Sequence, residues 1–65
     1  MKLQTEIVEN RLAERGEKAN WIAFELDMTT WYVRDIVAGK VSCSERTAKN
    51  IARLLEFDDW RVLIK

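Results

Sequence analysis

The sequence predicts an all-α protein, a small bundle of four to five helices in a single domain spanning residues 1–65. Three observations support this fold class. Apolar residues recur at helical spacing along most of the chain. The chain has no proline and only two glycines, whereas a β-rich domain of this size needs more turn residues. A chain this short buries only about 60% of the surface it exposes when unfolded, which leaves room for one small core.

Each helix follows from apolar spacing and from the residues that end it. The first helix ends at Gly16, which is free to adopt the left-handed cap conformation, and the third ends at Gly39. A loop over residues 40–44 precedes the fourth helix. The predicted helices cover residues 3–15, 18–26, 30–38 and the stretch from that loop to residue 55.

Short polar side chains predict where the later helices begin. Thr29 or Thr30 can cap the third helix. Ser42, with Glu45 three residues later, fits a capping box before the fourth, and Ser44 fits the cap position equally well.

The C-terminal segment admits two predictions. Asp58 can cap a short fifth helix that ends near Ile64, whereas the alternation over residues 60–65 also fits a strand.

Composition excludes several classes of protein. No apolar run approaches the roughly 18 residues of a membrane span, and no secretory signal is present, so a cytoplasmic protein is expected. A single cysteine, Cys43, cannot form a disulfide within one chain. Histidine is absent, which removes the usual general base and the commonest metal ligand. We therefore expect no enzyme, no metal site and no cofactor.

Charge is balanced overall but unevenly distributed. Eleven basic residues match eleven acidic ones, which alone speaks against a nucleic-acid partner. Residues 34–55, however, contain five basic and two acidic residues, whereas residues 1–33 contain four basic and six acidic. An anionic partner would bind the later stretch, unless these charges only solvate helix faces.

The second and third helices are separated by about three residues, so the chain must turn sharply between them. A small residue is needed where the helices approach, and Ala23 occupies that position. Leu26 and Met28 fill the corner, and Val33 and Ile36 face inward from the third helix. This is the packing of a helix-turn-helix, whose second helix fits the DNA major groove.

From Arg11 to Asp59 the chain resembles the phage repressor and Cro type of helix-turn-helix family, which has the lambda-repressor-like fold. One departure from the family pattern is Asp27, which stands where the family has a turn glycine; aspartate tolerates the left-handed conformation at some cost. The matching residues are Ile22, Ala23, Leu26, Met28, Val33, Ile36, Gly39, Lys40, Ser44, Thr47, Ala48, Ile51, Ala52, Leu54, Leu55, Phe57 and Asp58.

The resemblance implies which residues read DNA bases. These are Thr29, Thr30, Trp31, Arg34 and Asp35, at the start and on the outer face of the third helix. Arg34 either donates two hydrogen bonds to guanine or pairs with a nearby carboxylate on the protein surface. Asp35 either accepts from cytosine or keeps Arg34 oriented.

The resemblance also implies two groups of phosphate contacts. One lies at the start of the second helix and the other in the loop before the fourth, where backbone N–H groups and short polar side chains suit phosphate. For Ser42 and Ser44, helix capping alone is the alternative. The implied contacts are Lys18, Asn20, Lys40, Ser42, Ser44 and Arg46.

Aromatic residues are unusually frequent around the predicted turn. Trp21 and Phe24 lie off the buried face of the second helix, and Trp31 and Tyr32 lie at the start of the third. One or two of the four are expected to pack in the protein. An exposed Trp31 could contact a thymine methyl group or a sugar, or the group could form an apolar patch for a protein partner.

The C-terminus carries more apolar residues than the end of a small monomer needs. In the family this region pairs two subunits, so that two recognition helices reach half-sites about 34 Å apart. Alternatively the tail folds back on its own core, as is expected for Trp60. The predicted dimer residues are Trp60, Val62, Leu63 and Ile64.

Two functions follow from these patterns. The first is a sequence-specific double-stranded DNA-binding regulator, a homodimeric repressor or Cro-like protein that occupies an operator in a bacterial cytosol or phage-infected host. The second is a protein-binding helix-turn-helix module, an antirepressor or adaptor, in which the surface aromatics dominate. Salt distinguishes them, because DNA binding through several phosphates weakens steeply as salt rises.

Overall fold

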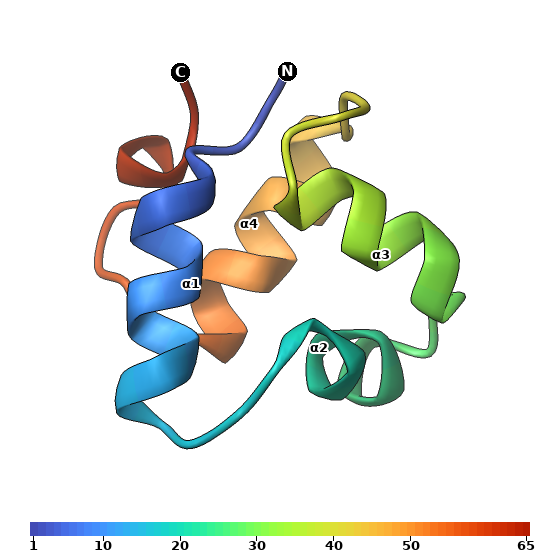
Figure 1. Cartoon of the computed structure of the whole chain (residues 1–65). Coiled ribbons are helices and arrows are strands. Elements are labelled where there is room, and N and C mark those ends of the chain that lie inside the picture. The colour runs from blue at the N-terminus through green and yellow to red at the C-terminus, as the bar shows by residue number, and fades with distance from the viewer.

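The structure is a computed structural model that describes all 65 residues, and it confirms the all-α prediction (Figure 1). None of the helices is both long enough and apolar enough to span a bilayer. The elements are α1 (Thr5–Glu14), α2 (Ala19–Leu26), α3 (Thr30–Val37), α4 (Glu45–Leu54) and a short 3₁₀ helix, η1 (Trp60–Leu63).

One core joins all of these elements. Val8 and Leu12 of α1 are buried, and the small side chain of Ala23 is buried where α2 approaches α3. The fourteen buried residues are Leu3, Val8, Leu12, Ile22, Ala23, Val33, Ile36, Val37, Cys43, Ala48, Ile51, Ala52, Leu55 and Leu63.

Helix starts agree with short polar caps, although not always with the expected residue. The hydroxyl of Thr29 accepts from the backbone N–H of Tyr32 and caps α3. Ser44, and not Ser42, caps α4, because the chain extends through Ser42 before α4 begins. The cap predicted at Asp58 is wrong: η1 begins one residue later, and its cap is Asp59.

A residue in a left-handed backbone conformation follows the end of each of the four α-helices. Gly16 and Gly39 have φ of 70° and 76°. Asp27, at the turn between α2 and α3, has φ of 55°, as predicted for the position where a glycine would be less strained. The N–H of Met28 then donates to the carbonyl of Ala23 at 2.9 Å, which satisfies the end of α2. Glu56, which the sequence did not single out, also has positive φ, at 63°.

The two ends of the chain lie side by side (Figure 1). Leu3 and Ile64 form an isolated antiparallel bridge, and the N–H of Gln4 donates to the carbonyl of Leu63 at 2.6 Å. The C-terminal segment is therefore the short fifth helix, in 3₁₀ form and ending at Leu63, followed by one bridging residue, and the alternative strand does not form.

Leu63 corrects the predicted dimer set. It is fully buried in the monomer core, so its side chain is not available to a second copy. Trp60 and Ile64 pack partly against the core, whereas Val62 is exposed. The tail thus folds back on its own chain, and only one edge of it reaches solvent.

Candidate nucleic-acid interface

α3 buries one side and presents the other to solvent. Val33, Ile36 and Val37 face the core, while Trp31 and Arg34 are exposed. An α-helix turns about 100° per residue, so a buried stripe of this spacing leaves the opposite side free along the full length of the helix. The outward side of α3 is therefore fixed by the residues that anchor its inner side.

α2 holds α3 in this orientation. The two helices pack against each other and are joined by the three residues Asp27–Thr29. In Figure 1, α2 is seen nearly along its axis while α3 runs across the view, so the helices are steeply inclined to each other. This arrangement leaves α3 at the edge of the molecule, with α1 touching it on its inner side.

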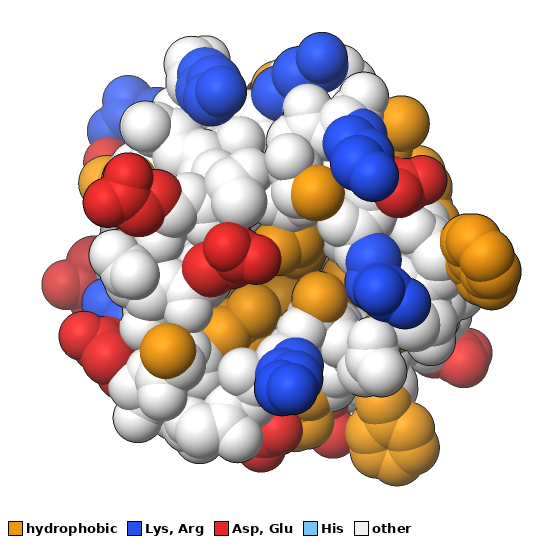
Figure 2. Space-filling model, viewed as in Figure 1, with side chains coloured by type: hydrophobic (Ala, Val, Ile, Leu, Met, Phe, Trp, Pro, Cys, Tyr) orange, Lys and Arg blue, Asp and Glu red, His pale blue; other side chains and the backbone are white.

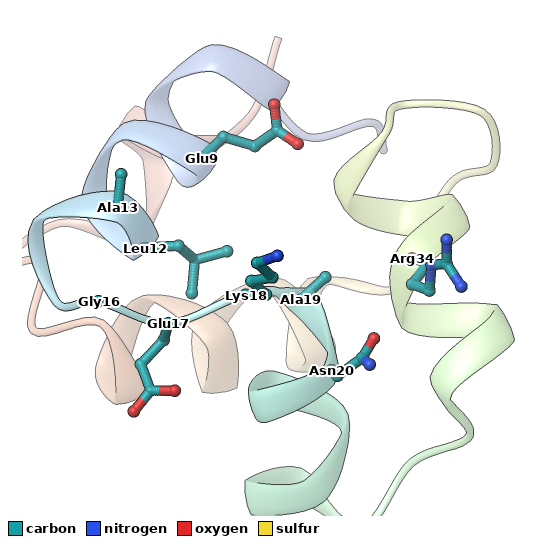
Figure 3. A pocket seen from close by; sticks show the side chains of 9 residues that line it. All are labelled: Glu9, Leu12, Ala13, Gly16, Glu17, Lys18, Ala19, Asn20 and Arg34. Atoms are coloured by element: carbon teal, nitrogen blue, oxygen red, sulfur yellow. The ribbon is translucent and has the colours of Figure 1, made fainter.

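A groove of about 750 Å³ lies between α1, the start of α2 and α3 (Figure 3). Arg34 lines the α3 side of this groove, Leu12 and Ala13 line the α1 side, and Lys18 and Asn20 lie on the segment between them. Two of the predicted phosphate contacts and the central base-reading residue therefore line one cavity.

A second hollow of about 510 Å³ continues the groove along α3. It shares Glu9, Ala19 and Arg34 with the first and adds Trp31 and Lys40 to the lining, together with Asp35. Residues from both ends of α3 are thus brought to one surface, which sequence spacing alone suggested but could not establish.

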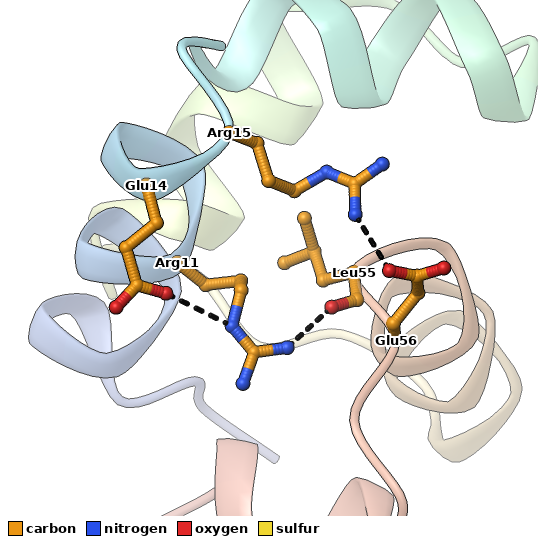
Figure 4. Close-up of polar contacts among 5 residues, drawn as sticks. All are labelled: Arg11, Glu14, Arg15, Leu55 and Glu56. Atoms are coloured by element: carbon orange, nitrogen blue, oxygen red, sulfur yellow. Dashed lines mark hydrogen bonds and ion pairs between the residues drawn. The ribbon is translucent and has the colours of Figure 1, made fainter.

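Ion pairs separate the cations into two classes. Four cations are paired with carboxylates: Arg11 with Glu14, Arg15 with Glu56, Lys49 with Glu45 and Arg61 with Asp59. Figure 4 shows how the first two are held, with Arg11 also donating to the carbonyl of Leu55 at the end of α4.

The cations predicted to contact DNA all belong to the other class. Lys18, Arg34, Lys40 and Arg46 are exposed and have no carboxylate within ion-pair distance. For Arg34, this decides against the alternative that it pairs with a carboxylate of its own surface. The guanidinium is free to donate to a ligand.

Acidic residues limit the positive potential of this surface. Glu9 and Glu17 line the groove, and Asp35 is half-buried in its continuation. Figure 2 shows acidic side chains over α1, basic ones over α3, and apolar ones in the hollow between them. The α3 side of the groove is therefore the side suited to an anion.

The loop before α4 holds its predicted contacts differently. The Ser44 hydroxyl accepts from the N–H of Thr47 and donates to the Thr47 hydroxyl, both at 3.1 Å, so it acts as a helix cap. Ser42 is exposed and makes no hydrogen bond through its side chain within the chain. The backbone between them is fixed, because the N–H of Cys43 donates to the Met1 carbonyl at 2.7 Å.

The remaining polar residues of the predicted surface, Thr29, Thr30 and Asn20, lie at the starts of α3 and α2. Thr29 caps α3, which leaves the exposed Thr30 hydroxyl without a capping role. Asn20 is exposed in the first turn of α2, beside Lys18 at the cap position. The first turn of α2 contains no acidic residue, although Glu17 directly precedes the cap position.

The four aromatics divide as the sequence suggested. Trp21 packs partly against the core, with the Arg15 guanidinium 5.1 Å from its ring centre. Phe24 and Trp31 are 80% and 83% exposed, and Tyr32 is exposed to a lesser extent. The two most exposed aromatics lie on α2 and α3, on either side of the connecting turn.

The contribution of α1 to the groove was not predicted. Glu9, Leu12 and Ala13 line it along one face of the helix, and Gly16 lines it just past the helix end. That face is visible in the sequence as a pattern, but which neighbour it meets depends on how α1 packs.

Comparison of the chain with models of known protein families, with curated proteins and with solved structures gave no match.

Proposed function

We propose that the protein is a sequence-specific double-stranded DNA-binding regulator of the helix-turn-helix type, similar to the phage repressor and Cro family, in which α2 and α3 form the helix-turn-helix. The observation that carries this proposal is the set of unpaired cations around the outward side of α3, since every cation predicted to contact DNA is free of a carboxylate partner.

The dimensions of α3 suit the major groove. An α-helix with its side chains is about 10–12 Å in diameter, and the groove is about 12 Å wide. Arg34, in the middle of the helix, can donate to O6 and N7 of guanine. Thr30 lies at the start of the helix, where a hydroxyl can contact a phosphate or a base edge.

Phosphate contacts at both ends of α3 would hold the duplex. Lys18 and Asn20 at the start of α2 form one group, supported by the N–H groups of that helix end. Lys40 and Ser42, on a loop that its backbone bonds to Met1 hold in place, form the other together with Arg46 in the first turn of α4. Ser44 supports this loop as a cap.

Regulation would follow from occupancy, because a protein that covers an operator blocks transcription without chemistry. Such a regulator acts in the bacterial cytosol or in a phage-infected host. Two copies paired through Val62, with the exposed edges of Trp60 and Ile64, would place two α3 helices on half-sites about 34 Å apart.

Selection of bound duplexes from a random DNA library at low salt tests the proposal. We expect enrichment of a consensus that contains guanine, and a symmetric consensus if two copies bind. The Arg34→Ala variant should fold normally and lose discrimination at one base pair, worth about 1–3 kcal/mol. Absence of any enriched sequence with the unaltered chain would contradict the proposal.

One observation favours a second candidate function, a protein-binding module of the same fold. Phe24 is 80% exposed on α2, and no DNA contact is proposed for it. Large exposed aromatics mark protein-binding surfaces when they are contiguous with other apolar groups. Salt separates the two functions, because apolar association does not weaken as phosphate contacts do.

A further inference from the structure

Trp31 is the largest exposed side chain on the outward side of α3. It is 83% exposed, and its ring takes part in none of the cation–π contacts of the molecule. Nothing in the fold requires an indole at this position, since the core contacts of α3 come from Val33, Ile36 and Val37. A side chain that costs solubility without packing in the protein is a candidate for contact with a ligand.

Helical geometry places Trp31 next to Arg34 on the surface. Three residues turn an α-helix by about 300°, so the two side chains lie about 60° apart and about 4.5 Å apart along the axis. Base pairs in DNA are stacked at about 3.4 Å along each strand. Two side chains at this separation therefore face the same or neighbouring base pairs.

The exposed edge of one base offers an apolar group to an indole. In the major groove, guanine, adenine and cytosine present hydrogen-bond donors and acceptors, and only thymine presents a methyl group, at C5. The indole has one donor and no acceptor, and the rest of it is apolar surface. A thymine methyl is therefore the base group that Trp31 fits best.

We infer that Trp31 reads the 5-methyl group of a thymine within one or two base pairs of the guanine bound by Arg34. This inference rests on the proposed DNA-binding function and specifies the sequence that α3 reads. It predicts a T beside a G in each half-site, with the methyl group and not the Watson–Crick edge of the thymine recognised.

The surroundings of Trp31 favour DNA over an apolar protein partner. The hollow that Trp31 lines also contains Arg34 and Lys40, which are both unpaired, together with the carboxylates of Glu9 and Asp35. An apolar partner on Trp31 would have to desolvate these charges without compensation, which is costly. DNA supplies phosphates and guanine acceptors for the cations and a methyl group for the indole.

Replacement of thymine by deoxyuridine tests the inference, because deoxyuridine lacks only the 5-methyl group. Affinity is measured by fluorescence anisotropy for the selected duplex and for duplexes with one thymine replaced at a time. At one position per half-site, we expect the unaltered protein to bind the deoxyuridine duplex about fourfold more weakly, the effect of one buried methyl group. Trp31→Ala should bind both duplexes equally, with circular dichroism as the check on folding.

The possible results are distinct. If the unaltered protein binds a consensus duplex but no deoxyuridine replacement weakens it, the inference is overturned and the proposed function stands. Equal sensitivity of the unaltered protein and Trp31→Ala would also overturn it, because another residue would then read the methyl group. If no duplex is selected, the proposed function and the inference fall together.

Discussion

The separation of paired from unpaired cations predicts how salt affects DNA binding. For B-DNA, the logarithm of the association constant falls with the logarithm of salt concentration with a slope of about −0.9 per neutralised phosphate. Lys18, Lys40 and Arg46 are unpaired and are proposed to contact one phosphate each, so they contribute about −2.7 to the slope. Between 50 and 200 mM salt this amounts to a loss of roughly 40-fold in affinity.

Neutralising two of these lysines should change the slope by a calculable amount. For the double variant Lys18→Gln, Lys40→Gln we expect a slope less negative by about 1.8, measured by fluorescence anisotropy over a salt series with the selected duplex. Lys49→Gln is the matched control, because Lys49 pairs with Glu45 at 2.8 Å and its ammonium lies 5.4 Å from the Trp60 ring centre.

The control should leave the slope unchanged. A double variant with the same slope as the unaltered protein would refute the assignment of these lysines to phosphate. A change of about 0.9 with Lys49→Gln, half of that expected for the double variant, would show that net charge, and not position, determines the effect.

Three further predictions concern stability. Leu63→Ala should lower the free energy of unfolding by about 2–5 kcal/mol in urea, since Leu63 is fully buried, whereas Val62→Ala should cost less than about 0.5 kcal/mol; equal losses would contradict the corrected role of the tail. Asp27→Gly should raise the free energy of unfolding by about 1 kcal/mol, because φ is 55° there, and a loss on urea titration would argue against backbone strain. Burial raises the pKa of the Cys43 thiol, so its contribution to stability is complete below the unfolded pKa of about 8.5 and is lost as pH rises through the folded pKa. Between pH 8 and 10, the free energy of unfolding should therefore fall less for Cys43→Ala than for the unaltered protein. An equal fall in both proteins would count against this.

Much of the fold could be predicted because local rules and tertiary packing agree. Apolar spacing located all four α-helices, and the structure gives each of them within two residues of the expected ends. The strained turn at Asp27 was also predictable, because only a left-handed residue closes so short a connection between α2 and α3.

The C-terminal segment shows where sequence reasoning fails. Its apolar residues can pair with a second copy or pack on their own core, and both outcomes give the same pattern. The choice depends on Leu3 and Gln4, about sixty residues away. Leu3 forms a bridge with Ile64, and the backbone N–H of Gln4 donates to the carbonyl of Leu63. A contact of that sequence separation leaves no local signal.

The candidate site was predictable in its residues but not in its shape. Spacing placed Arg34 and Trp31 on the outer side of α3, and the structure leaves both exposed. The groove beside Arg34 was not predicted, because it needs the face of α1 that carries Glu9 and Leu12. Three of the four ion pairs join residues two to four positions apart, and only the Arg15–Glu56 pair depends on tertiary packing.

The proposed function depends on DNA binding to the outward side of α3. Amide chemical shifts of the ¹⁵N-labelled protein, titrated with the selected duplex, test this binding surface most directly. The account predicts that the largest changes fall on residues 18–20, 29–35 and 40–46, with the Trp31 indole N–H among them. Changes confined to α4 and η1, with α3 unaffected, would contradict it.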